Sequence, residues 1–498
     1  MGSSQCPDIV LIVLDCVSAR DFYGGIDAVP GLKAAQSLAR EGVVYSRAVA
    51  PASWTLPSHA SMFSGLYPWE SGAYGFEGGE RYFRGRTMAE RLHSIGFQTG
   101  CFSANPSLNP ESGLTQGFDS VYWGSWADCT LRKLTKWTSA VSSARLEGDI
   151  SRPVDRIPKW SLPIVRKTID SLPIASDVAT RLISRALGGG SGSQSRVAPW
   201  IEVSVERWLT AARKDKPVFC FVNLLDAHEP FIGLPERISE IASWLNPLLI
   251  AQRGTGRYGN HDPVNAPDGD VFRRLYRVAI GILDTRLALL FQILQKTRDW
   301  DSTCVIVTGD HGQAFGEDDV LFHWKGIPDS VHRVPLIVKP VRDKGEHQLN
   351  RSWTTLRSLP SIIAATSFGD GPLGKIISLP FPNGKVDNSE PLALSLADGQ
   401  EDWPGIHHGN GARWVEATRA IVGYSGEYKI VIDTKTLEPR AFALPHNGGS
   451  TLEQVSVDDV PFPNLKLAME EAATMVHQSD IVRASNGVSH NLRSWGYE

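Results

Sequence analysis

The stretch Asp8-Ile9-Val10-Leu11-Ile12-Val13-Leu14-Asp15 decides the fold of this chain. It contains a continuous apolar run, rich in β-branched residues, which is typical of a strand buried on both faces of a parallel sheet. Similar runs follow at residues 97–102, 218–225, 303–308 and 334–339. Helical patterns separate them, at residues 31–41, 87–95, 203–213 and 271–297. This alternation predicts a doubly wound α/β sheet, in which ligands bind beyond the carboxyl ends of the strands.

Length and composition narrow the class of protein. A chain of 498 residues suits one large α/β domain with a smaller one, and its net charge of −4 argues against a nucleic-acid partner. No apolar run reaches the ~18 residues of a membrane span, so no transmembrane segment is expected. Residues 1–7 lack the basic region of a signal peptide. The cysteines at 6, 16, 101, 129, 220 and 304 show no paired spacing, which favours a reduced, cytoplasmic setting. A homo-oligomer stays an open alternative.

We expect two units, a catalytic domain over residues 1–370 and a C-terminal subdomain over residues 371–498. Within the first, residues 125–198 predict a helical insertion that ends in a Gly/Ser-rich linker. This insertion could be a lid or a contact surface for an anionic partner, although a solvated helical excursion is the more ordinary interpretation. In the second unit, residues 414–422 and 427–434 predict short strands of a small sheet.

Two strand ends carry residues that suit a metal ion. Asp15 directly follows the first buried run, where a carboxylate is costly unless it binds a cation or caps a helix. Capping of a helix that starts near Val17 is therefore the alternative to metal binding. Asp310-His311-Gly312 follows the run at 303–308, and its carboxylate and imidazole are both ligands for divalent ions. The two segments together predict one metal site.

Thr55 is the candidate nucleophile, in Ser53-Trp54-Thr55-Leu56-Pro57-Ser58-His59. A threonine hydroxyl is nearly inert at its ordinary pKa, and coordination to a metal ion would activate it. The residues after it open a helix whose amino-terminal N–H groups could hold a transferred oxyanion. The alternative is that Thr55 only caps this helix.

Further polar residues are candidates for contact with substrate. His228 follows the run at 218–225 and could protonate a leaving group, although it could also be a loop histidine paired with Asp226. His323 and Lys325 follow the Asp310 segment and could contact an anion, as a general acid and as a charge respectively. Asn105 follows the run at 97–102 and is expected to line the pocket.

In this order, these residues resemble the sulfatase branch of the alkaline phosphatase superfamily over nearly the whole chain. The resemblance is carried by Asp15, by Thr55-Leu-Pro-Ser-His59 and by Gly65-Leu-Tyr-Pro68. Asp226-Ala-His228, Asp310-His-Gly and Arg333-Val-Pro335 extend it, and it ends near Tyr428-Lys429. It implies a large mixed, mostly parallel sheet flanked by helices, with a small C-terminal antiparallel sheet.

The resemblance also implies roles for single residues. Asp15, Asp310 and His311 would be metal ligands, with Thr55 as the nucleophile that completes the metal shell. His228, His323 and Lys325 match contacts to the substrate anion, and His59 is assigned to substrate binding with Asn105. The ion would be Mn²⁺, Mg²⁺, Ca²⁺ or Zn²⁺.

Three departures from the family pattern bear on the reaction. Family sulfatases carry Cys or Ser at the position of Thr55, for oxidation to formylglycine, and threonine cannot form that aldehyde. His59 replaces an arginine, and Cys16 replaces the second aspartate of an Asp-Asp pair, which predicts a less negative metal site. We therefore expect a metal-dependent hydrolase or transferase of phosphate mono- or diesters, or of phosphonate esters, through a phospho-threonine intermediate. The alternatives are a sulfatase that uses unmodified threonine and a catalytically silent anion-binding relative.

Overall fold

The fold is described by a computed structural model. It describes residues 6–23, 32–73, 85–123, 200–228, 266–317, 321–323, 327–341, 348–369, 371–377, 393–398, 419–444, 453–461 and 463–486. The predicted insertion at 125–198 lies outside these residues, as do Lys325 and the segment at 414–418.

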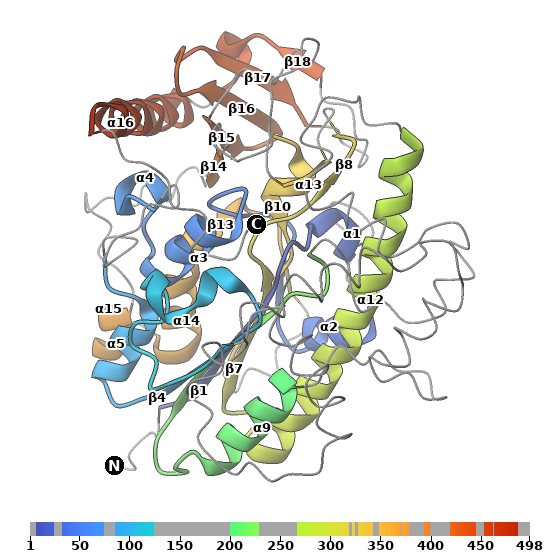
Figure 1. The fold of residues 1–498 in the computed structure, drawn as a ribbon, viewed down its shortest axis with the longest axis vertical. Helices are drawn as coiled ribbons and strands as arrows, with labels where there is room; N and C mark the ends of the chain where they lie inside the picture. The colour runs from blue at the N-terminus through green and yellow to red at the C-terminus, as the bar shows by residue number, and fades with distance from the viewer. Residues whose placement is uncertain are drawn as a thin grey trace, which may run out of the picture.

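A mixed eight-stranded sheet forms the centre of the molecule (Figure 1). Its order is β12-β2-β11-β7-β1-β6-β4-β5, where the strands are β1 (Asp8–Leu14), β2 (Val43–Tyr45), β4 (Gln98–Ser103), β5 (Ser120–Trp123), β6 (Val218–Leu224), β7 (Thr303–Gly309), β11 (Leu336–Lys339) and β12 (Gln348–Asn350). Only β11 runs antiparallel to its neighbours; the other described pairs are parallel. The predicted large, mostly parallel sheet is therefore confirmed.

Helices cover both faces of this sheet, as expected for a doubly wound fold. One face packs against α1 (Ala19–Tyr23), α2 (Lys33–Arg40), α9 (Trp200–Ala211) and α12 (Ala266–Thr297). The other packs against α3 (Thr55–Ser64), α5 (Met88–Ser94), α14 (Leu359–Phe368) and α15 (Pro372–Ile377). Figure 1 shows the two groups on opposite sides of the strands. The unbroken apolar pattern of β1 is explained by its burial on both sides.

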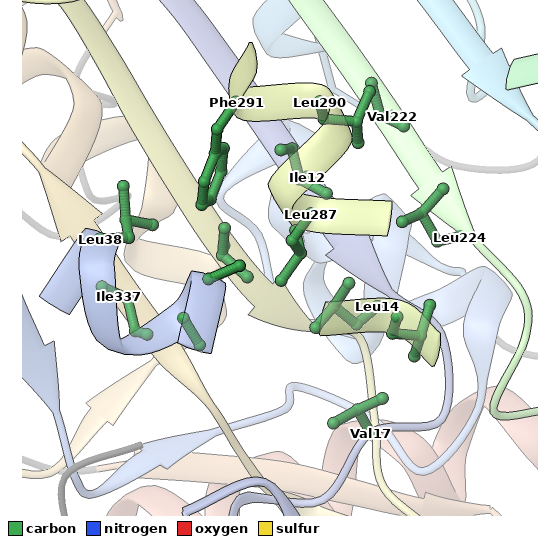
Figure 2. Packing of buried hydrophobic residues seen from close by; sticks show 14 of the residues in the cluster. Ile12, Leu14, Val17, Leu38, Val222, Leu224, Leu287, Leu290, Phe291 and Ile337 are labelled. Carbon is green, nitrogen blue, oxygen red and sulfur yellow. The ribbon is translucent and has the colours of Figure 1, made fainter. Parts of the chain in front are cut away.

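Alternate residues of β1 enter the two cores. Val10, Ile12 and Leu14 face the first core, where Figure 2 shows Ile12 and Leu14 beside Leu287 of α12 and Leu224 of β6. Ile9, Leu11 and Val13 belong to the second core. Successive strand side chains point to opposite faces, so a single apolar run builds both layers.

A second, antiparallel sheet of five strands forms the C-terminal part, with order β14-β15-β16-β17-β18. Its strands are β14 (Ala393–Asp398), β15 (Arg419–Ser425), β16 (Tyr428–Asp433), β17 (Pro439–Ala443) and β18 (Glu453–Val455), and α16 (Pro463–Asn486) packs on it (Figure 1). This confirms the predicted small C-terminal sheet. Leu396 of β14 exchanges backbone hydrogen bonds with the Pro51–Ser53 segment, at 2.9 and 3.0 Å. The C-terminal part thereby holds the chain just ahead of Thr55.

The remaining described elements are short. They are β3 (Ala48–Val49), β8 (Ala314–Phe315), β9 (Leu321–Phe322), β10 (Arg333–Val334), β13 (Thr354–Thr355), α4 (Pro68–Ser71), α13 (Asp329–His332) and 3-10 turns at Pro106–Leu108, Pro110–Ser112, Leu356–Ser358 and Val457–Asp459. The single strand predicted at 334–339 was wrong. It divides into β10 and β11 at Pro335, because proline has no N–H to continue the ladder.

Helix α12 qualifies the expectation that no segment could span a membrane. Among the described residues, its Tyr276–Thr297 part is long and apolar enough to do so, with a mean hydropathy of 1.5. One face of this part, including Leu283, Leu287 and Leu290, packs in the first core against the sheet. This is the packing of a core helix, so its length and composition are weak evidence for a membrane span.

Candidate active site

The carboxyl ends of four adjacent strands bring the predicted residues together. In the order β7-β1-β6-β4, Asp310 follows β7, Asp15 follows β1 and Asn105 follows β4 closely. The register pairs Leu14 with both Leu224 and Gly309, so Asp15 and Asp310 leave neighbouring strands at the same level. Ligand atoms of Asp15, Asp310 and His311 all lie within 4.8 Å of one another.

Asp15 is fully buried and is held by two amides. Its Oδ2 accepts hydrogen bonds from Asn105 Nδ2 at 2.7 Å and from Asn223 Nδ2 at 3.2 Å. Ser18, and not Asp15, accepts the amino-terminal N–H of α1, from Asp21 to Ser18 Oγ at 3.2 Å. The carboxylate of Asp15 is therefore directed at the cluster of charged groups, and helix capping does not explain it.

Asp310 Oδ2 and His311 Nε2 lie on the side of the cluster, 3.4 Å apart. Asp310 Oδ1 accepts hydrogen bonds from the backbone N–H groups of Cys16 and His311, at 3.0 and 2.9 Å, whereas its buried Oδ2 has no hydrogen-bond partner. His311 Nδ1 donates to the carbonyl of Gly312 at 3.0 Å, so Nε2 carries the lone pair. A Cβ at Gly312 would lie 1.9 Å from Ser330 O, so only glycine fits this turn.

The hydroxyl of Thr55 faces this cluster. Thr55 is the first residue of α3, and its Oγ1 lies 3.3 Å from His311 Nε2 and 3.4 Å from Asn105 Nδ2. The residue at the N-cap is Trp54, and its side chain makes no cap hydrogen bond. Thr55 is therefore not a helix cap. Ser58 fixes α3 to the strand end, since its hydroxyl donates to Asp310 O at 2.6 Å.

His59 lies behind the nucleophile. Its Nδ1 donates to Thr55 O at 2.8 Å and lies 3.6 Å from Asp310 Oδ2. The ring is fully buried, edge-on to Phe63 and Phe221, and Nε2 has no hydrogen-bond partner. Its described contacts are thus with the protein, and the assignment to substrate binding stays a prediction.

His228 and His323 flank the cluster on the side of β6 and β7. Their rings are edge-on with centroids 5.3 Å apart, and the His311 and His323 centroids are 4.4 Å apart. His323 is buried and donates from Nδ1 to Gln313 Oε1 at 2.8 Å, whereas His228 is half-buried. Asp226 Oδ2 binds Arg286 at 2.5 Å.

Arg286 is a structural residue that the sequence reasoning missed. It also binds both oxygens of Glu202, at 2.5 and 3.0 Å, and so ties α9 and α12 to the end of β6.

Asn223 was missed as a partner of Asp15, although a polar residue inside an otherwise apolar run could have marked it. Cys16 was treated only as a missing carboxylate. Its Sγ lies 3.4 Å from Asp15 Oδ1, 3.7 Å from His323 Nδ1 and 3.9 Å from His311 Nε2.

The electrostatics of the cluster suit a cation. Burial, and then the charge of Asp15, raise the pKa of Asp310 to about 7. Burial opposes ionisation of Asp15, but His228, His311 and His59 hold its pKa below the usual value. Burial and the neighbouring His311 hold the pKa of His323 well below its usual range. Two buried carboxylates, an unpartnered oxygen and a histidine lone pair therefore fit a divalent ion, which would compensate this charge.

Known proteins match this chain in sequence and in fold. It is 20% identical over 386 residues to the uncharacterized sulfatase YidJ of Escherichia coli K12. The aligned residues cover 72% of this chain and 67% of YidJ. The structure of the phosphonate monoester hydrolase of Agrobacterium radiobacter superposes with a TM-score of 0.59 at 19% identity, covering 95% and 96% of the two chains. The phosphonate monoester hydrolase SpPMH of Silicibacter pomeroyi superposes with a TM-score of 0.53 at 16% identity, covering 98% and 96%.

These structural matches confirm the alkaline-phosphatase-like fold that the resemblance implied. The sulfatase family model matches residues 7–363, which include every strand end that contributes to the site. The chain belongs to the sulfatase family.

Proposed function

We propose that this sulfatase-family hydrolase cleaves phosphate or phosphonate esters with the unmodified hydroxyl of Thr55 as its nucleophile. The observation that carries the proposal is the position of Thr55 Oγ1, at the start of α3 and 3.3 Å from His311 Nε2. A nucleophile at the edge of a set of metal-ligating side chains is the arrangement of metal-assisted ester cleavage.

The chemistry of threonine supports a phosphorus ester over a sulfate ester. Oxidation of its secondary hydroxyl would give a ketone, so the aldehyde hydrate that attacks sulfur in family sulfatases cannot form at Thr55. A threonine oxygen can instead attack phosphorus directly and leave as a phosphoester. The two superposed structures named above are of phosphonate monoester hydrolases, which agrees with this substrate class.

The side chains divide the reaction among them. Asp15, Asp310 and His311 would hold the divalent ion, which when bound supplies neutralising charge for the ester oxygens and activates the nucleophile. Thr55 Oγ1 gives up its proton to solvent and forms a bond to phosphorus as the bond to the leaving oxygen breaks. His228 is half-buried, whereas His323 is buried, so His228 is the histidine that donates a proton to that oxygen. Water then cleaves the phospho-threonine, and an alcohol in its place would make the enzyme a transferase.

Asn105 and the start of α3 position the reacting groups. The amide of Asn105 bridges Asp15 and Thr55, at 2.7 and 3.4 Å, and so fixes the hydroxyl relative to the ligand set. The amino-terminal N–H groups of α3 stabilise negative charge on the transferred group. Lys325 stays a proposed anion contact outside the described residues.

The test is the Thr55→Val variant, which keeps the β-branched shape and removes the hydroxyl. Turnover of p-nitrophenyl phosphate, bis-p-nitrophenyl phosphate and a phenyl phosphonate ester should fall by at least about 10⁴-fold, as when other nucleophiles are removed. Ser61→Ala is the matched control, because Ser61 lies on the same helix, is buried and has a hydroxyl without a hydrogen-bond partner. Full activity of Thr55→Val would refute the mechanism.

Sulfate-ester cleavage is the second candidate, because the chain belongs to the sulfatase family. The ratio of turnover on p-nitrophenyl sulfate to turnover on the phosphorus esters separates the two. Thr55-dependent cleavage of the sulfate alone would replace the phosphoester proposal. Absence of turnover on all four, with no divalent ion bound, would identify a silent relative.

A further inference from the structure

We propose that Cys16 is a ligand of the divalent ion through its Sγ, and that this thiolate makes the site select a thiophilic ion such as Zn²⁺ over Ca²⁺ or Mg²⁺. The inference rests on the metal site of the proposed function and adds a ligand and an ion class to it. It also revises the expectation of a less negative site, because a thiolate restores the charge that the missing second aspartate would bring.

The distances around Sγ fit ligands of one ion. Sγ lies 3.4 Å from Asp15 Oδ1 and 3.9 Å from His311 Nε2, and His311 Nε2 lies 3.4 Å from Asp310 Oδ2. Two ligands at about 2.3 Å (sulfur) and 2.0 Å (oxygen or nitrogen) from a tetrahedral Zn²⁺ would be about 3.5 Å apart. An uncharged thiol next to an imidazole would not require the carboxylates of Asp15 and Asp310 to lie at the same place.

The backbone directs the thiol into the cluster at a cost. Cys16 has φ 62°, in the left-handed region that is unfavourable for a residue with a side chain. Distant residues hold this conformation: Cys16 N donates to Asp310 Oδ1 at 3.0 Å, and the Tyr276 hydroxyl donates to Cys16 O at 2.7 Å. The same hydroxyl accepts from Ser18 N at 2.7 Å. A strained residue held by Asp310, which follows β7, and by Tyr276 of α12 indicates a functional position.

An independent observation points to a cation at this place. Asp310 Oδ2 is buried and has no hydrogen-bond partner, although such an atom costs free energy when it is left unsatisfied. The lone pair of His311 Nε2 is directed to the same region, because Nδ1 is fixed as a donor to Gly312 O. A cation at this place would bind Asp310 Oδ2, His311 Nε2 and the thiolate together.

The other buried cysteines of the described residues differ from Cys16. Cys101, Cys220 and Cys304 are buried in the strands of the main sheet, and burial raises the pKa of each thiol. Cys101 and Cys304 belong to the second apolar core, and the Cys304 thiol lies 3.6 Å from Thr366 Oγ1. These are packing residues, whereas ion binding at Cys16 would break its S–H bond, release the proton to solvent and form an S–metal bond without oxidation or reduction.

The experiment uses the full-length protein loaded with Co²⁺ in place of its own ion. A near-ultraviolet charge-transfer band from thiolate to cobalt should appear in the native protein and in Cys304→Ser, and should be absent from Cys16→Ser. In competition titrations, Cys16→Ser should bind Zn²⁺ at least about 100-fold more weakly than the native protein. Loss of a residue that only hydrogen-bonds to a metal ligand costs about 10–100-fold, so a larger loss indicates that Cys16 itself is a ligand.

Cys16→Asp keeps the test decisive if the serine variant does not fold. Aspartate tolerates the left-handed backbone, so this variant should bind a divalent ion without the band, and its preference for Zn²⁺ over Ca²⁺ should fall. A native Co²⁺ form without the band, or a band that persists in Cys16→Asp, would refute the Cys16 inference alone. A native protein that binds no divalent ion would instead refute the metal-dependent function with it.

Discussion

Asp310→Asn is expected to stabilise the metal-free protein above neutral pH, although it removes a metal ligand. The folded state raises the pKa of Asp310 from 3.8 to about 7, chiefly because the side chain is buried. A raised pKa of an acid means that the folded state favours the protonated form. Stability therefore falls as pH rises from about 4 to about 7, and the loss persists at higher pH.

The size of this effect follows from the shift. At 1.36 kcal/mol for each pKa unit, the charged Asp310 costs the metal-free fold about 4 kcal/mol above pH 7. The asparagine amide avoids that charge. It can keep the hydrogen bonds of Oδ1 to Cys16 N and His311 N, and its NH₂ group would lie near the lone pair of His311 Nε2.

The assay is guanidinium unfolding followed by circular dichroism, with EDTA, at pH 5, 6, 7 and 8. The advantage of Asp310→Asn should grow with pH and level off near pH 8. With an added divalent ion the advantage should shrink, because an ion at 100 times its Kd stabilises the native protein by about 2.7 kcal/mol and the variant lacks a ligand. A variant that is less stable than the native protein at pH 8 in EDTA, or an advantage independent of pH, would refute this reasoning.

Three further variants test other parts of the structure. Burial opposes ionisation of Asp329, but Lys429, bound at 2.6 Å, holds the pKa of Asp329 below its usual value. Asp329→Asn should therefore lower the free energy of unfolding by about 1.5–3 kcal/mol near neutral pH, and this loss should shrink as the pH falls through the lowered pKa, the opposite dependence to Asp310→Asn; a loss that grows in acid would contradict it. Arg286→Met should lower the free energy of unfolding by about 3–5 kcal/mol, because it leaves the buried carboxylates of Glu202 and Asp226 unpaired. The control is Arg213→Met, which removes an exposed ion pair with Asp215 and should change stability by less than about 1 kcal/mol. Similar losses in both variants would contradict the difference between buried and exposed ion pairs. Asn105→Asp keeps an acceptor for Ser107 N but removes the amide donor to Asp15, so kcat should fall about 10–100-fold in a steady-state assay, and an unchanged kcat would exclude the positioning role.

Much of the fold follows from local patterns. The runs at 8–14, 97–102, 218–225 and 303–308 each became a strand of the main sheet, because an apolar β-branched run has to be buried wherever it lies. The convergence of Asp15 with Asp310-His311 also follows, since residues after adjacent parallel strands meet at one edge of the sheet. The break at Pro335 was missed, although the proline itself was a readable signal for it.

The partners of individual side chains did not follow in the same way. Asp226 and His228 leave the same strand two residues apart, and Asp226 turns to Arg286 because that helix residue is packed beside it. Thr55 and Asp15 each had helix capping as an equally local alternative, which only the positions of His311, Asn105 and Ser18 excluded. Spacing along a chain does not encode which neighbour a polar group meets.

By itself the sequence determined the sheet, its two apolar layers and the strand ends at which the chemistry had to lie. The tertiary structure decided that the thiol of Cys16 lies 3.4 Å from Asp15 Oδ1 and that His59 lies behind the nucleophile. The physical reason is range: burial of an apolar run is dictated by its own residues, whereas the direction of a polar side chain is dictated by hydrogen bonds to residues such as Tyr276, which lies 260 positions from Cys16.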